Sequence, residues 1–123
     1  MTDIKGAKES KVFCDLVVKG MLEMKASQIA VLDFADVTNA VADYFIVCSG
    51  GSDTQIDAIA DSVEDEVYKV TNSHPWKKEG KENKEWILID YGNVVVHIFR
   101  SDRREFYALE KLWGDAAISY IEE

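Results

Sequence analysis

The feature that most constrains the fold of this chain is the segment 86–99, which is typical of a tight β-hairpin. Short, mostly apolar runs lie on both sides of Gly92-Asn93, a dipeptide that favours a two-residue turn. A turn at this place sets one register for the two strands. The predicted partners across the hairpin are Asp90 with Val95, Leu88 with His97, and Trp86 with Phe99.

Period-two alternation assigns the hairpin side chains to two faces. The first face collects Ile87, Ile89, Tyr91, Val94, Val96 and Ile98. The second face collects Trp86, Leu88, Asp90, Val95, His97 and Phe99. We expect the first face to be core. The second face combines apolar anchors with polar groups, as interaction surfaces do. If helices cover this face, it is core as well. His97 taken alone is most simply a satisfied strand histidine.

The segments before the hairpin predict two helices and two strands. Apolar residues at spacings of three or four predict helices over 11–24 and 53–70, and a capping box at Ser52 and Gln55 marks the start of the second helix. Short β-branched and aromatic runs predict buried strands over residues 29–34 and 44–48.

The segments on either side of the hairpin are a loop and a helix by the same criteria. Residues 71–84 are polar and charged, which predicts an exposed loop. After the hairpin, helical spacing is carried by Phe106, Leu109, Trp113, Ala117 and Tyr120.

The predicted fold class is α/β, a small mixed β-sheet flanked by helices in the order α-β-β-α-β-β-α. A right-handed crossover through the helix 53–70 places the strands at 44–48 and 86–90 side by side and parallel. We expect residues 1–10 to be a flexible N-terminal tail and residues 11–123 to be a single domain.

Composition indicates a domain that folds without disulfide bonds or bound metals. The chain has 123 residues, 47% of them hydrophobic, which is enough for a core without metals or disulfides. Cys14 and Cys48 show no CxxC spacing and are typical of buried thiols in a reducing compartment. Because neither a membrane-spanning run nor a signal segment is found, we expect a cytoplasmic protein.

The charge of the chain favours a basic partner over a nucleic acid. The formal net charge is −9, and residues 51–75 hold six acids against Lys69 alone. Because phosphate neutralisation needs clustered Lys and Arg, we expect little direct nucleic-acid contact. From composition alone, a solvated acidic surface is the commonest explanation of this charge, and a basic protein partner is the less frequent functional one.

Two long motifs resemble the ribosomal silencing factor (RsfS, Iojap) family. One motif is D-Y-F-I-V-x-S-G over residues 43–50, followed by Ser52 and Gln55. The other runs through the hairpin and beyond it, and is carried by Trp86, Leu88, Asp90, Gly92, Val94, Val96, His97, Phe99, Arg104, Phe106, Tyr107, Leu109, Glu110, Leu112 and Trp113. The resemblance covers roughly residue 12 to the C-terminus.

This resemblance implies a translation repressor. It would bind ribosomal protein number fourteen of the large subunit on the face that meets the small subunit, and so block subunit joining by bulk alone, without a catalytic residue, cofactor or metal. The expected partner-binding residues are Trp86, Leu88, Asp90, His97, Phe99, Asp43 and Tyr44. The resemblance also implies a nucleotidyltransferase-like topology, and a homodimer of the free protein is left open.

Two other functions remain to be weighed. A nucleotidyltransferase would carry metal-binding acids on a strand, whereas Asp57, Asp61, Glu64 and Asp65 lie on a predicted helix, where their spacing cannot direct them at two metal ions. An assembly factor for the large subunit fits the same residues as a repressor. The sequence does not separate repression from assembly.

Overall fold

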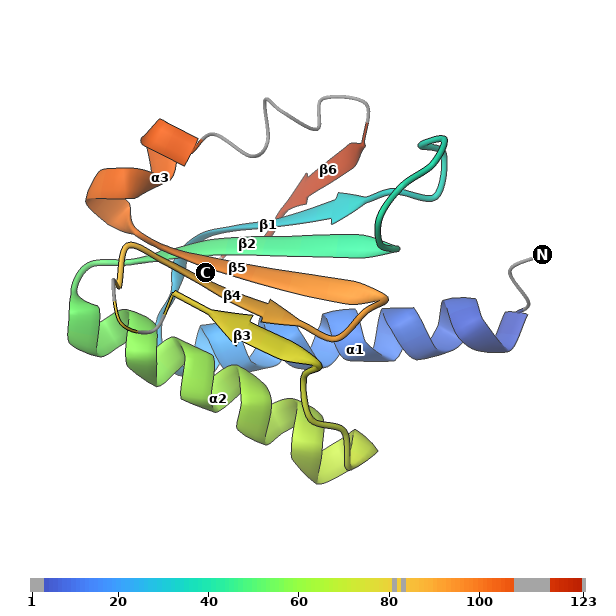
Figure 1. The fold of residues 1–123 in the computed structure, drawn as a ribbon, viewed down its shortest axis with the longest axis horizontal. Coiled ribbons are helices and arrows are strands. Elements are labelled where there is room, and N and C mark those ends of the chain that lie inside the picture. The colour runs from blue at the N-terminus through green and yellow to red at the C-terminus, as the bar shows by residue number, and fades with distance from the viewer. Residues whose placement is uncertain (1–3, 81, 83, 108–115, 123) are drawn as a thin grey trace.

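Six strands form one mixed sheet with helices packed on it (Figure 1). The computed structural model describes residues 4–80, 82, 84–107 and 116–122. The elements in chain order are α1 (Ile4–Glu23), β1 (Ser27–Asp33), β2 (Tyr44–Gly50), α2 (Asp53–Thr71), β3 (Lys77–Glu79), β4 (Trp86–Asp90), β5 (Val94–Arg100), α3 (Ser101–Tyr107) and β6 (Ala117–Tyr120). Across the sheet the strand order is β3-β4-β5-β2-β1-β6. The expected class, a small mixed sheet flanked by helices, is confirmed.

The hairpin has the predicted turn and register. Strands β4 and β5 pair antiparallel, with Asp90 opposite Val95, Leu88 opposite His97 and Trp86 opposite Phe99. The Tyr91 amide donates to the Val94 carbonyl oxygen over 2.9 Å, which leaves Gly92 and Asn93 as the two turn residues. Gly92 has φ 89°, a conformation that a glycine adopts without strain and that hairpin turns of this length require.

The parallel pair differs from the prediction. Strand β2 pairs in parallel with β5, not with β4, and β4 lies one strand further out. The physical reason is burial: six of the seven β5 residues are buried, whereas buried and half-buried residues alternate along β4. The strand that is buried on both faces therefore takes the central position, and β4, which is half-buried on one face, lies further out.

Two edge strands were missed. Strand β3 lies within the segment expected to be a loop, and β6 contains Ala117 and Tyr120, which were expected in the last helix. Ala117–Tyr120 instead pairs antiparallel with β1. The pairing satisfies the backbone of β1, and this tertiary requirement outweighs the helical spacing of the side chains. Of the other residues in that predicted helix, Leu109 and Trp113 lie outside the described residues.

Helix α2 lies at its predicted position, whereas α1 begins seven residues before its predicted start at residue 11. Helix α1 begins at Ile4, so the expected boundary between residues 10 and 11 falls inside it. Helix α2 begins after Ser52, whose Oγ accepts from the Gln55 amide over 3.1 Å. The Gln55 Oε1 in turn accepts from the Gly51 amide over 2.6 Å, which completes the reciprocal cap. Neither helix, nor any other in the described part of the chain, is long and apolar enough to cross a membrane.

Helices α1 and α2 cover the first face of the sheet, as Figure 1 shows. The hairpin residues predicted to be core all pack there with apolar residues of the two helices. The helices approach closely at Gly20, where an added Cβ would lie 2.7 Å from the Val63 Cα. Ser62 Oγ donates to the Gly20 carbonyl oxygen over 2.9 Å at the same crossing. This close contact fixes both helices against one side of the sheet.

Candidate functional site

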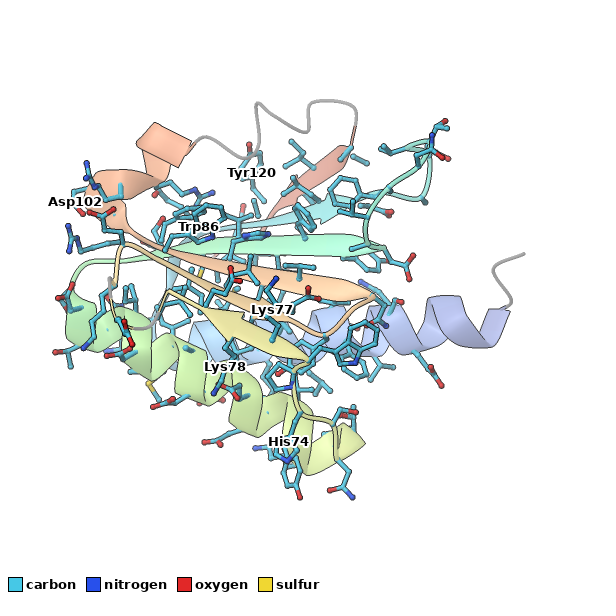
Figure 2. The ribbon with its side chains drawn as sticks, in the orientation of Figure 1. His74, Lys77, Lys78, Trp86, Asp102 and Tyr120 are labelled. Carbon is cyan, nitrogen blue, oxygen red and sulfur yellow. The ribbon has the colours of Figure 1, made fainter. Side chains whose placement is uncertain are left out.

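A cluster of rings occupies the second face of the sheet, on the side away from α1 and α2 (Figure 2). Trp86 of β4 stacks on Phe99 of β5 with ring centroids 5.2 Å apart. The His97 ring lies 5.7 Å from Trp86 and 4.7 Å from Phe45 of β2. Phe34, just after β1, meets Phe45 edge-on at 4.8 Å. The rings thus form a continuous layer from β4 to β1 across the middle of the sheet.

His97 holds Trp86 in this layer. The indole Nε1–H donates to Nδ1 of His97 over 3.0 Å. Burial lowers the pKa of His97 to about 4, so the imidazole is neutral at physiological pH. A neutral ring that accepts at Nδ1 carries its proton on Nε2, and Nε2 is buried without a hydrogen-bond partner. Nδ1 therefore has the partner expected of a satisfied strand histidine, whereas Nε2 does not.

The second-face residues differ in their access to solvent. Phe99 is fully buried and His97 is 4% exposed. Trp86, Leu88 and Asp90 on β4 are half-buried. Of the five hairpin residues expected to bind a partner, the three on β4 are thus presented at the surface. His97 and Phe99 can act on a partner only through Trp86, which they support.

Asp90 stabilises the hairpin turn. Its Oδ1 accepts from the Gly92 amide over 2.7 Å, a local bond that Asp commonly makes in turns. Its carbonyl oxygen accepts from the amide of Trp76 over 2.8 Å, just before β3. Asp90 therefore has a structural role whether or not its second carboxylate oxygen meets a partner.

Asp43 and Tyr44 lie at the start of β2, apart from the ring layer. The Asp43 carboxylate accepts from Ser10 Oγ over 2.5 Å, and Asn93 Nδ2 donates to the same hydroxyl over 3.0 Å. This network joins α1, the hairpin turn and β2. Tyr44 packs against the helix-covered core, on the opposite side of the sheet from Trp86. The structure thus brings Asp43 beside the hairpin turn but does not bring Tyr44 onto the second face.

A cavity of about 660 Å³, called here the turn recess, opens at this end of the sheet. Its walls come from the segment 33–44, from Ser10 of α1, and from Gly92 and Asn93 of the hairpin turn. Asp33 and Asp43 line it together with apolar side chains of the loop between β1 and β2. The chain has no Lys or Arg between Lys25 and Lys69, so this loop carries negative charge alone. Such a lining suits a long side chain with a positive end.

Several acids of α2 are paired with basic side chains of the described residues. Asp57 pairs with Lys84 at 2.9 Å, and Glu64 pairs with Lys78 of β3 at 3.3 Å. Glu66 is buried between Lys19 of α1 and Lys69, which lower the pKa of its carboxyl group. These acids tie α2 to neighbouring elements, and no cluster of three or more metal-ligating side chains occurs among the described residues.

Sequence reasoning missed three residues at the turn end of the sheet. Ser10 lies in the segment expected to be a tail, and nothing in its sequence context indicates that it bonds Asp43. Asn93 was identified as a turn residue without a side-chain role, although Asn is common in turns for its hydrogen bonding. Trp76 was placed in an exposed loop. A tryptophan in a polar segment is the one signal that could have pointed to it.

Known proteins resemble this chain along nearly its whole length. A family model described as "Ribosomal silencing factor during starvation" matches residues 7–123. The ribosomal silencing factor RsfS of Bacillus subtilis is 41% identical over 100 residues, which cover 81% of this chain and 83% of that protein. RsfS of Halalkalibacterium halodurans is 39% identical over 107 residues, covering 87% and 90% of the two chains.

Solved structures agree with these sequence matches. A crystal structure of a Chromobacterium violaceum protein superposes with a TM-score of 0.78 at 30% identity, and the match covers 92% of each chain. A Bacillus halodurans crystal structure superposes with a TM-score of 0.74 at 33% identity, covering 92% of this chain and 99% of that one. The motifs of the hairpin and of β2, the fold and these matches lead to one conclusion: the chain belongs to the ribosomal silencing factor family.

Proposed function

We propose that this protein represses translation by binding ribosomal protein number fourteen of the large subunit and thereby blocking access of the small subunit. The observation that carries the proposal is the presence of half-buried apolar side chains on β4 together with an acidic recess at the hairpin turn, in a chain of the silencing factor family. Repression of this kind is steric. A folded body of 123 residues on the joining face suffices, and it needs no chemical step.

The apolar part of the docking surface is the part of the second face that lies on β4. Trp86 is half-buried and held by the His97 bond and by stacking on Phe99. Because its ring is already ordered, binding costs little additional side-chain entropy. Tryptophan is also among the residues that most often dominate interface energies. Trp86 and Leu88 are therefore the expected apolar anchors.

The turn recess supplies the polar part of the surface. It is large enough for an arginine or lysine side chain, and Asp33 and Asp43 line it. A basic ribosomal protein presents such side chains, whereas an RNA presents phosphates that the acids would repel. The recess adjoins the hairpin turn through Gly92 and Asn93, so a single partner can fill it and also reach Asp90. The protein would then contact the ribosome mainly through ribosomal protein and little through RNA. We expect this binding to take place in the cytoplasm.

Assembly of the large subunit is the second candidate function. A Mus musculus relative named "Mitochondrial assembly of ribosomal large subunit protein 1" is 32% identical over 107 residues, which cover 85% of this chain and 46% of that protein. An assembly factor would use the same docking surface on an immature particle. The two roles differ in the particle that is bound and in the effect on subunit joining.

Sucrose-gradient sedimentation with purified large and small subunits tests the proposal. We expect the protein to co-sediment with large subunits only and to reduce the fraction of joined ribosomes when it is added first. Trp86→Ala should weaken binding by about 2 kcal/mol or more. Leu22→Ala, at an exposed position of α1 on the helix-covered side, is the matched control and should bind normally.

Two results would decide against repression, and a third would move the docking surface. Binding to small subunits or to neither subunit removes the proposed docking. Normal joining in the presence of bound protein, together with preferential binding to immature large subunits, favours assembly. Normal binding by Trp86→Ala shows that the docking surface lies elsewhere.

A further inference from the structure

Trp76 is the most exposed large hydrophobic residue in the described part of the chain, with 82% of its surface accessible. It lies just before the edge strand β3 and belongs to neither core cluster. Single exposed apolar residues are common on protein surfaces. An exposed tryptophan that the surrounding structure holds in one place is less common and calls for a reason.

Local contacts hold the Trp76 segment in place. The Trp76 amide donates to the Asp90 carbonyl oxygen over 2.8 Å, and Pro75 restricts the backbone before it. Two residues earlier, the His74 ring stacks on Tyr68 of α2 with centroids 4.7 Å apart. Figure 2 shows His74 beside the end of α2, below the strand that carries Lys77. The backbone of Trp76 is therefore ordered before any partner arrives.

The ring of Trp76 rests on the hairpin turn. An added Cβ at Gly92 would lie 3.0 Å to 3.3 Å from three atoms of the indole six-membered ring. A glycine at this turn position thus lets the indole lie against the backbone. Gly92 also lines the turn recess. Trp76 and the recess thus have Gly92 as a common neighbour, which puts both within reach of one partner.

We propose that Trp76 is a second aromatic anchor of the docking surface and that it receives an arginine or lysine side chain of the large-subunit protein. This assignment rests on the proposed function and extends it to a residue outside the hairpin faces. Two observations favour a cationic occupant: the neighbouring loop, with Asp33 and Asp43, carries only negative charge, and the indole face attracts cations more strongly than any other side-chain ring. Lys77 is paired with Glu79 at 3.3 Å, so it adds little net repulsion.

Titration of purified ribosomal protein number fourteen into the wild-type protein and into variants tests this assignment. Trp76→Ala should raise the Kd about tenfold or more, since a central tryptophan commonly contributes that much. Trp76→Phe should retain more affinity than Trp76→Leu, because only an aromatic ring attracts a cation through its face. Tyr120→Ala is the matched control: its ring is 67% exposed on β6, at the opposite edge of the sheet, and its removal should leave the Kd unchanged.

The outcomes separate this assignment from the docking proposal. If the wild-type protein binds neither the purified protein nor large subunits, the proposed function fails. If the wild type binds and Trp76→Ala binds equally well, only the role of Trp76 fails. Equal affinities of the Phe and Leu variants would overturn the cationic occupant. If Trp76→Ala weakens binding to large subunits but not to the purified protein, the contact is made to another ribosomal component such as RNA, and the assignment is again overturned.

Discussion

The two faces of strands β4 and β5 perform different tasks with alternate residues of the same backbone. On the first face, Ile87, Ile89, Val96 and Ile98 are fully buried under α1 and α2. On the second face, three of the six side chains carry rings, and burial decreases from β5 to β4 to the exposed residues of β3. The difference shows that a sheet can be core at its centre on both sides and still leave side chains near one edge half-buried on one side.

The largest expected effect comes from neighbours on β5 that point to opposite faces. Ile98→Ala on the first face should lower the free energy of unfolding by about 2–5 kcal/mol, and Phe99→Ala on the second face by about 3–5 kcal/mol, because both side chains are fully buried. Chemical denaturation of both variants checks this. If Phe99→Ala costs less than about 1 kcal/mol, the second face is surface throughout and the comparison between the faces fails.

A smaller effect is expected from the His97–Trp86 bond, and it should depend on pH. The folded pKa of His97 is lowered to about 4 from an ordinary value of about 6.5, so the unfolded chain takes up the proton first. Stability contributed by neutral His97 is present above about pH 6.5 and is lost as the pH falls toward 4, by up to about 3 kcal/mol.

His97→Phe keeps a ring in this position but cannot be protonated and cannot accept from the Trp86 indole. The substitution should lower the free energy of unfolding by about 1–3 kcal/mol at pH 7, because the indole Nε1–H of Trp86 loses its acceptor. The variant should also show a shallower fall in stability between pH 6.5 and pH 4 than the wild type. Denaturation midpoints across this pH range measure both quantities. If the wild type and the His97→Phe variant lose stability in the same way as the pH falls, the titration of His97 does not contribute to stability.

The smallest expected effect on stability separates two roles of Asp90. Asp90→Asn keeps an acceptor for the Gly92 amide and should change stability by less than about 1 kcal/mol. Asp90→Lys loses that acceptor and adds repulsion toward a basic partner, so it should weaken ribosome binding more than Asn does. Thermal melts beside sedimentation distinguish the roles. Wild-type affinity in both variants would limit Asp90 to the turn.

Much of the fold could be predicted from local patterns. The hairpin register, the capped start of α2 and the apolar first face follow from residues close together in sequence: Gly92-Asn93 sets the turn, Ser52 and Gln55 cap the helix, and alternation assigns the faces. The family motif lies in these same segments. The candidate anchors Trp86 and Leu88 could therefore be named before the structure, and their role in binding remains a prediction.

The sequence by itself determined which residues share a face; only the tertiary structure decided what covers each face and which strands meet. The parallel partner of β2, the pairing of Ala117–Tyr120 with β1, the contact of Ser10 with Asp43 and the placement of Trp76 on Gly92 join segments far apart in the chain. Side-chain periodicity reports local backbone geometry. Pairing between distant strands depends instead on satisfying backbone hydrogen bonds and burying apolar area across the whole domain, and no local pattern records that balance.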